Sequence, residues 1–340
     1  MKRFVLAAAA ATMLSAVGGI TAAKADTAGC DSGETVIKFA HVVAASGHPK
    51  GDAAAALAAA INEEMEGKAC MEVYPNSTLY DDDKVLEAML LGDVQIAAPS
   101  LSKFEAYTKR YRLFDLPFLF DDLAAANRFL TSDAGKELLT ALDDQGYAGL
   151  GYLGAGIKQF SAGKPLEQPT DANGLKFRIQ TSDVADAMIS ALGASAQKLA
   201  FKEVYGALQT GVVDGQENSW CNIYTQKFFE VQDGVTETNH GLLAYLMVTS
   251  KDFLDGLDED VRTQFLEIVN RELAEANENV ANLEAECKAK IVEAGTTVRE
   301  LTPEQKQAWI EAMQPVYDQF KGDVGGDEAL EQARAVNNQG

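Results

Sequence analysis

The chain has 340 residues, with 51 Asp and Glu against 29 Lys and Arg, and a formal net charge of −22. Such a surface repels nucleic acid and anionic lipid head groups, so we expect neither as a partner. It also repels a small anion at long range, so a site for one needs positive charge gathered in a cleft.

The first residues have the pattern of a secretory signal peptide. Lys2 and Arg3 precede an alanine-rich apolar run over 4–17, and Ala23-Lys24-Ala25 forms an A-x-A cleavage site. The apolar run is too short and too rich in small residues for a membrane anchor. We therefore predict a cleaved signal peptide over residues 1–25 and export to the periplasm.

Four cysteines in an oxidising compartment permit three complete pairings. We favour Cys30–Cys70, because Cys30 precedes the first predicted strand, Cys70 begins the second, and neighbouring parallel strands start side by side. Cys221 and Cys287 then form the other bridge, with free buried thiols as the alternative. The chain has no C-x-x-C, so neither a redox enzyme nor a zinc site is supported.

The predicted elements alternate between strand and helix. The chain is longer than a single hydrophobic core usually supports, so we expect two lobes. Strands are predicted at 35–40, 70–74 and 94–98, with helices at 51–66 and 82–91 and a turn at 75–77. This β-α-β-α-β order implies a parallel sheet. Two helices, near 124–130 and 134–144, follow.

A second β-α-β-α-β series predicts a second lobe of the same design. Residues 148–153 and 158–162 look extended. Strands are then predicted at 176–180, 196–199 and 213–216, with helices at 183–192 and 201–210. After an apolar strand at 242–249, residues 259–294 predict a helix about 54 Å long, enough to cross both lobes. A helical segment near 304–320 precedes a polar, mobile tail at 326–340.

Motifs for catalysis and cofactors are weak. Residues 149–154 match G-x-G-x-x-G, but no helix start follows, so we interpret the match as accidental. The three histidines, His41, His48 and His240, lack metal-binding spacing, and no G-x-S-x-G is present. We predict a binding protein without catalysis, metal or cofactor. The alternative, a secreted hydrolase or lyase, has no motif behind it.

Arg178 lies in a short apolar strand, where a buried arginine needs an anion beside it. Its planar fork suits a carboxylate, which it can hold with two charge-assisted hydrogen bonds. The alternative is an internal salt bridge, which charge statistics alone favour. Lys158, Ser100 and Asn218 lie on or just after predicted strands that lead towards the region between the lobes, where parallel strands place ligands.

Several ordered segments carry a family resemblance, and they are residues 38–43, 49–51, 73–77, 91–95, 98–104, 116–120, 174–180, 201–218, 222–228 and 239–241. Through them the chain resembles the extracytoplasmic solute receptors of tripartite ATP-independent periplasmic (TRAP) transporters. Within these receptors it is similar to the C4-dicarboxylate-binding branch. The resemblance runs from about residue 35 to residue 320.

The resemblance implies an α/β periplasmic-binding-protein fold, with two lobes joined by crossing strands and one long helix that spans both. We place lobe 1 at 26–155 plus 244–283 and lobe 2 at 156–243 plus 284–325. It also implies that closing lobes capture a small organic acid, which the receptor then delivers to membrane permease subunits, and we expect the receptor to be monomeric. A C4-dicarboxylate such as succinate, malate or fumarate is our first choice, and a keto acid, sugar acid or sulfonate is the rival. A receptor for a signalling partner is a further alternative.

The resemblance also assigns site residues. The arginine that matches Arg178 binds the ligand carboxylate, the position of Lys158 gives a second contact, and that of Asn218 a hydrogen bond at the same end. Further candidates for the pocket are Lys50, Ser100, Asn222 and Tyr245. The branch usually reads Tyr-Trp-Asp-Asn-Gly-Phe-Lys where this chain has residues 152–158, and we expect this departure to reshape the distal end of the pocket.

Overall fold

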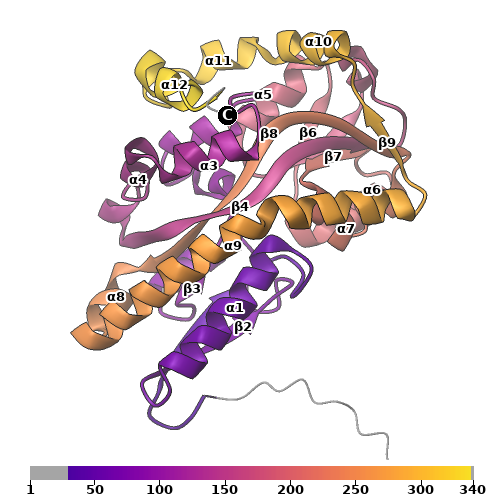
Figure 1. The fold of residues 1–340 in the computed structure, drawn as a ribbon. Coiled ribbons are helices and arrows are strands. Elements are labelled where there is room, and N and C mark those ends of the chain that lie inside the picture. The colour runs from indigo at the N-terminus through magenta and orange to yellow at the C-terminus, as the bar shows by residue number, and fades with distance from the viewer. Residues whose placement is uncertain (1–29, 338–340) are drawn as a thin grey trace, which may run out of the picture.

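One nine-stranded sheet runs through residues 30–337, the part of the chain that this computed structural model describes (Figure 1). The predicted signal peptide lies outside the described residues. The order of the main strands is β2-β1-β3-β8-β4-β7-β5-β6, and β9 pairs with β8. The strands are β1 (Thr35–Ala40), β2 (Ala69–Tyr74), β3 (Ile96–Ala97), β4 (Tyr147–Ala162), β5 (Lys176–Ile179), β6 (Ser195–Lys198), β7 (Gly215–Asn218), β8 (Gly234–Ser250) and β9 (Thr297–Glu300).

Two parallel units flank a pair of long antiparallel strands. Strands β2, β1 and β3 form one unit, and β7, β5 and β6 form the other, which confirms both predicted β-α-β-α-β series. Strands β4 and β8 pair with each other along most of their length and join the units. The two-lobed class of fold is therefore as predicted, while our residue limits for each lobe stay a prediction.

The extent of the two long strands is the main departure from the predicted strands. We expected two extended pieces at 148–153 and 158–162, but β4 is one strand of 16 residues. Its glycines lie beside register shifts, and Gly151 and Gly156 have φ of +155° and +118°, which glycine adopts without a Cβ clash. Strand β8 likewise begins at Gly234, before the predicted start at 242.

The helices cover both faces of this sheet (Figure 1). They are α1 (Pro49–Glu64), α2 (Val85–Leu90), α3 (Leu123–Thr131), α4 (Asp133–Leu138), α5 (Asp183–Ala191), α6 (Val204–Gln209), α7 (Trp220–Thr225), α8 (Lys251–Gly256), α9 (Glu259–Glu293), α10 (Pro303–Met313), α11 (Pro315–Phe320) and α12 (Gly326–Arg334). None of those in residues 30–337 is both long and apolar enough to cross a membrane.

The predicted tail at 326–340 is wrong for most of its described part, because residues 326–334 form α12. Leu330 and Ala333 are buried on one face of this helix. Residue 337, the last that the structure describes, also makes a tertiary contact, since Asn337 Nδ2 donates to the Leu119 carbonyl oxygen at 3.0 Å. The high polarity of the segment concealed a sparse apolar face that tertiary packing covers.

The long helix α9 has 35 residues, close to the predicted 259–294, and connects two separate apolar clusters. Phe265 and Leu273 pack with residues of β1 and α1. Cys287 and Ile291, near the other end, pack with residues of α6 and α7. Figure 1 shows α9 running diagonally across both parts of the molecule, as the prediction of a spanning helix requires.

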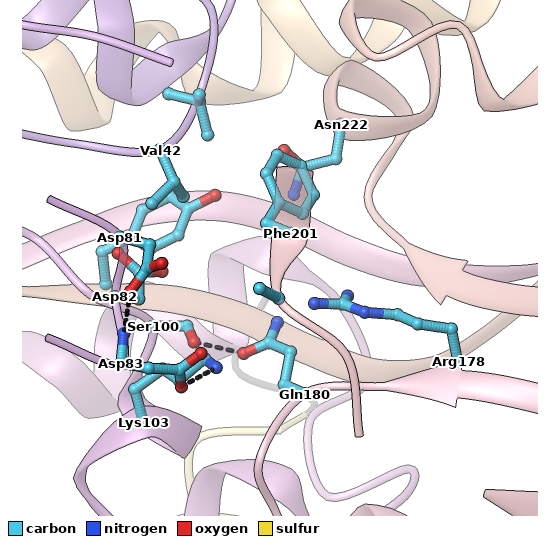
Figure 2. Close-up of a pocket in the computed structure, with 13 residues that line it drawn as sticks. Val42, Asp81, Asp82, Asp83, Ser100, Lys103, Arg178, Gln180, Phe201 and Asn222 are labelled. Carbon is cyan, nitrogen blue, oxygen red and sulfur yellow. Dashed lines mark hydrogen bonds and ion pairs between the residues drawn. The ribbon is translucent and has the colours of Figure 1, made fainter. Parts of the chain in front are cut away.

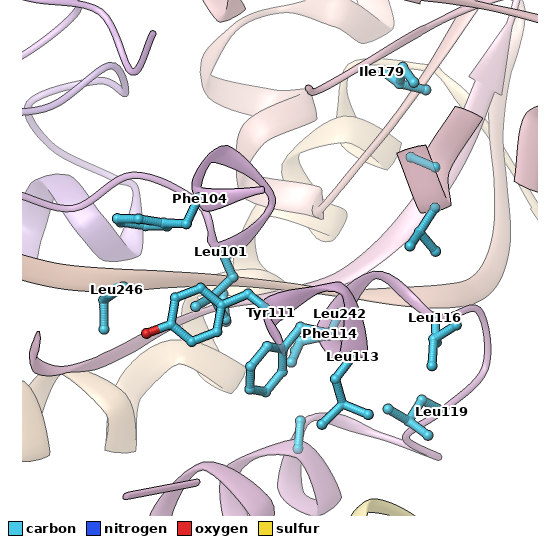
Figure 3. Packing of buried hydrophobic residues seen from close by; sticks show 14 of the residues in the cluster. Leu101, Phe104, Tyr111, Leu113, Phe114, Leu116, Leu119, Ile179, Leu242 and Leu246 are labelled. Atoms are coloured by element: carbon cyan, nitrogen blue, oxygen red, sulfur yellow. The ribbon is translucent and has the colours of Figure 1, made fainter. Parts of the chain in front are cut away.

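A third cluster holds the segment between β3 and α3 in place (Figure 3). Phe104 and Tyr111 contact edge to face, with ring centroids 5.7 Å apart, and Phe114 lies beside Tyr111. Leu242 and Leu246 of β8 belong to the same cluster. This packing fixes the backbone that carries Ser100 and Lys103.

Both predicted disulfides are present. Cys30 and Cys70 have Cα atoms 5.4 Å apart, and those of Cys221 and Cys287 are 5.0 Å apart. The alternative of free buried thiols is therefore wrong. The second bridge ties α7 to α9.

Candidate functional site

A cavity lies where strands of both parallel units end (Figure 2). Residues that follow β1, precede α2 or follow β3 line one side of it. The end of β5 and residues 200–201 line the other side. Asn222 from α7 and Tyr245 from β8 complete the wall. The carboxyl ends of parallel strands are the usual place for a ligand in an α/β fold.

Three polar contacts join the two sides of this cavity. Ser100 Oγ donates to Gln180 Oε1. Lys103 Nζ lies 3.3 Å from Thr181 Oγ1, and Lys202 Nζ is 3.1 Å from Asp81 Oδ2. Each pair connects segments that are far apart in the sequence, so the structure describes a conformation closed around the cavity.

Arg178 lines the cavity and has an edge of its guanidinium unused. Its Nε and Nη2 donate to the Leu199 carbonyl oxygen at 3.1 and 2.9 Å, and these bonds fix the orientation of the group. Nη1 is buried without a hydrogen-bond partner among the described residues. Since a guanidinium has five N–H donors, the edge formed by Nη1 and Nη2 is available to a carboxylate.

Arg178 keeps its positive charge although it is buried. Desolvation lowers the pKa of this guanidinium from 12.5 to about 10, and the nearby carboxylates of Glu217 and Asp82 oppose the shift. Arg178 therefore stays a cation at neutral pH. Its Cζ also lies 5.8 Å from the centroid of the Phe201 ring, within the range of a cation–π contact.

Lys158 makes the internal ion pair that we had considered for Arg178. Its Nζ is 3.0 Å from Glu217 Oε2, and both side chains are buried. Burial alone lowers the pKa of Lys158, but Glu217 and Asp115 raise it overall. His240 Nε2 approaches the same Glu217 oxygen at 3.6 Å. Lys158 is not among the residues that line the cavity, so the structure gives no support for its predicted contact with a ligand.

Asn218 is also held internally, whereas Asn222 reaches the cavity. Asn218 Nδ2 donates to Gln216 Oε1 at 2.9 Å, and Asn218 Oδ1 accepts from Asn222 Nδ2 at 2.7 Å. Asn222 Oδ1 lies 3.0 Å from Nε2 of His48. His48 Nδ1 accepts from the Lys50 amide at 3.1 Å, so its Nε2 carries the proton that Asn222 accepts. Asn218 thus acts behind the cavity wall.

Of the remaining candidates, Ser100 and Tyr245 line the cavity and Lys50 lies behind Tyr245. The Lys50 Nζ is 3.7 Å from the centroid of the Tyr245 ring and donates to the Ala98 carbonyl oxygen at 2.8 Å. Burial lowers the pKa of Lys50 from 10.5 to about 8, and the Asp82 carboxylate opposes this. The side chain is thus a cation with little water around it.

Sequence reasoning missed several residues of the cavity wall, namely Gln180, Lys103, Phe201 and the acidic run Asp81, Asp82 and Asp83. Burial raises the pKa of the Asp82 carboxyl, and the charge of Lys50 opposes this. Segments 98–104, 174–180 and 201–218 had been singled out, but spacing along a chain does not tell which side chains face the opposite lobe.

Residues 153–157, which depart from the family pattern, do not line the cavity. Leu153 and Ala155 are buried in the cluster of β1, α1 and α9, and Gly156 faces Glu284 of α9. Our expectation that this departure reshapes the distal end of the pocket therefore finds no support here.

Metal ligation has one candidate group among residues 30–337, which is Cys30, Glu34 and Cys70. Both of its sulfurs form a disulfide and cannot bind an ion as thiolates. We assign no metal to it. The G-x-G-x-x-G match at 149–154, which we interpreted as accidental, lies within β4 and opens no helix.

Comparisons with known proteins agree with this architecture. The sequence profile of the bacterial extracellular solute-binding proteins, family 7, matches residues 39–323. The C4-dicarboxylate-binding periplasmic protein DctP of Vibrio cholerae is 57% identical over 310 residues, which cover 91% of this chain and 93% of that protein.

Solved structures give the same result. A TRAP periplasmic solute-binding protein from Shewanella oneidensis, with bound succinate, matches with a TM-score of 0.88 at 45% identity, covering 90% of this chain and 100% of that chain. One from Pseudomonas aeruginosa, with bound L-malate, matches with a TM-score of 0.82 at 43% identity, covering 84% and 99%. The resemblance and the prediction of a binding protein are confirmed, and the chain belongs to family 7 of the bacterial extracellular solute-binding proteins.

Proposed function

We propose that this protein captures a C4-dicarboxylate in the periplasm and delivers it to the membrane permease of a TRAP transporter. The free edge of the buried Arg178 guanidinium carries the proposal. An unpartnered N–H on a buried cation is costly, and a carboxylate is the group whose geometry matches two parallel donors.

The second carboxylate of such a ligand needs a donor elsewhere in the cavity. Lys103 lines the wall opposite Arg178, and Figure 2 shows the two cations on different sides. Lys50 adds positive charge behind Tyr245. Two relatives at 45% and 43% identity were solved with succinate and L-malate, which carry two carboxylates each.

A sugar acid is the second candidate, because Asp81, Asp82 and Asp83 also line the cavity. Carboxylates there would accept hydrogen bonds from ligand hydroxyls and would repel a second ligand carboxylate. A more distant relative of the same fold, with a TM-score of 0.86 at 27% identity, was solved with galactonate. L-Malate combines the two carboxylates of the first candidate class with one hydroxyl group of the kind that a sugar acid carries.

Calorimetric titration of the purified protein with succinate, L-malate, fumarate, butyrate and galactonate tests the proposal. We expect the C4-dicarboxylates to bind at one site per chain, far more tightly than butyrate. Tight binding of galactonate together with no heat from the dicarboxylates would replace the first candidate by the second. Uptake of the bound acid that requires the permease genes would support delivery to a transporter, and uptake without them would argue against it.

A further inference from the structure

Glu284 is the only charged residue on the buried face of α9 that the structure describes. Val280, Cys287 and Ile291, which share this face, are apolar and fully covered. The side chain of Glu284 therefore occupies a position where the pattern of the helix predicts an apolar residue. A carboxyl group at such a position is costly unless hydrogen bonds satisfy it.

The two oxygens of Glu284 satisfy the first amides of α7. Oε2 accepts from the Trp220 amide at 2.9 Å, and Oε1 accepts from the Cys221 amide at 3.0 Å. A helix usually receives this cap from its own N-cap side chain. Here the N-cap residue, Ser219, makes no side-chain capping bond. The cap of α7 therefore comes from α9, which lies more than 60 positions further along the chain.

Strand β4 leaves room for this carboxyl group. A Cβ on Gly156 would lie 2.3 Å from Glu284 Oε2, and φ of +118° at this position also favours glycine. The register of β4 against β8 shifts between Gly154 and Gly156. Glu284 therefore passes the crossing strand at Gly156, a position where this chain keeps the glycine of the family pattern.

Helix α7 carries a residue of the cavity wall. Asn222 follows Cys221 directly, lines the cavity, and contacts His48 at the start of α1. The Cys221–Cys287 disulfide fixes α7 to α9 about one turn beyond Glu284. Helix α9 thus holds α7 at two adjacent points, and α1 packs against the same helix.

We propose that Glu284 is a positioning residue of the ligand site. Its side chain sets the position of α7 and thereby the position of the Asn222 side chain. The inference rests on the proposed function for its ligand, but the capping contact itself does not. A loss of the cap leaves the disulfide in place and lets the first turn of α7 rotate or fray. Asn222 then loses its fixed approach both to the cavity and to His48.

The experiment compares Glu284→Gln with Val280→Ala, a matched control from the same buried face of α9. Glutamine keeps the size of the side chain but offers one acceptor, so one α7 amide meets an NH₂ group. We expect both variants to lower the melting temperature. Only Glu284→Gln should weaken succinate binding in calorimetry, by about tenfold, which corresponds to 1.4 kcal/mol. Unchanged affinity in Glu284→Gln would overturn the inference.

A double variant separates positioning from general damage. If Glu284 acts through Asn222, then Glu284→Gln should cost no further affinity in an Asn222→Ala background, because effects that share one path are not additive. Additive losses would contradict the proposal. Should Glu284→Gln fail to fold, Glu284→Asp keeps both acceptors on a shorter side chain and takes its place.

Hydrogen exchange in the ligand-free protein distinguishes failure of this inference from failure of the proposed function. The amides of Trp220 and Cys221 should exchange faster in Glu284→Gln than in the wild type, and Val280→Ala should leave them protected. If the wild type binds no dicarboxylate, the proposed function fails. The exchange rates of these two amides then test the inference independently. Equal protection in both variants would then refute it.

Discussion

Replacing Arg178 by alanine should weaken ligand binding by about two to three orders of magnitude. The guanidinium is buried, and its unpartnered Nη1 lies in the cavity wall. Breaking a buried ion pair by removing one partner costs roughly 3–5 kcal/mol, and each 1.4 kcal/mol is a factor of ten in the dissociation constant. The ligand carboxylate would then lie in a closed cavity without its main counter-charge.

Lysine at this position should also bind poorly, because Arg178 performs two tasks at once. One edge of the guanidinium holds the Leu199 carbonyl oxygen, and the other edge is free for the ligand. An ammonium is a compact charge on a flexible stem and cannot present two parallel donors to a carboxylate while it keeps the bond to Leu199. We expect Arg178→Lys to lie closer to Arg178→Ala than to the wild type.

The assay is calorimetric titration with succinate and L-malate, together with the ligand-induced rise in melting temperature. Lys176→Ala is the matched control, since Lys176 lies on the same strand, β5, but is exposed. It removes the same unit of charge and should leave the affinity nearly unchanged. Wild-type affinity in Arg178→Ala would refute the reasoning, and equal losses in Arg178→Ala and Lys176→Ala would show that only long-range charge matters.

Three further predictions concern stability. Lys158→Met leaves the Glu217 carboxylate buried without its partner, so this variant should lower the free energy of unfolding in urea by about 3–5 kcal/mol. Adding Glu217→Gln should restore most of this loss. No recovery in the double variant would contradict the prediction. Burial lowers the pKa of His41 from 6.5 to about 3, so the unfolded chain binds the extra proton and stability falls as the pH drops from 6.5 towards 3. His41→Leu should flatten that slope in unfolding titrations between pH 4 and 7, whereas parallel curves would show that His41 is not responsible. The Cys221–Cys287 bridge closes a loop of 66 residues. Replacing both cysteines by alanine should lower the free energy of unfolding in guanidinium by about 4 kcal/mol. An unchanged midpoint would exclude a stabilising role for the bridge.

The elements that the sequence predicted well are those with strong local signals. Strand β1 has the predicted limits, and α9 differs from its prediction by one residue. An apolar run bounded by polar residues and a long stretch without proline or glycine need no tertiary information. Helices α7, α8 and α12 were missed because they are short or polar, and packing against other elements supplies their stability.

The candidate site was predicted in part. Arg178, Ser100, Asn222 and Tyr245 do line one cavity, while Lys158 and Asn218 contribute from behind its wall. A basic residue on a crossing strand can face either a ligand or a buried carboxylate. The sequence holds 51 acidic residues and does not say which of them lies opposite.

The sequence by itself predicted the class of fold, the favoured pairing of the cysteines and the residue types that a carboxylate receptor needs, because periodicity, cysteine position and charge are local or compositional properties. Only the tertiary structure decided which cation stays free. Arg178 keeps an open guanidinium edge since a backbone carbonyl, which carries no full charge, holds its other edge. Lys158 is paired since β4 and β7 lie side by side and bring Glu217 within 3.0 Å of its ammonium group.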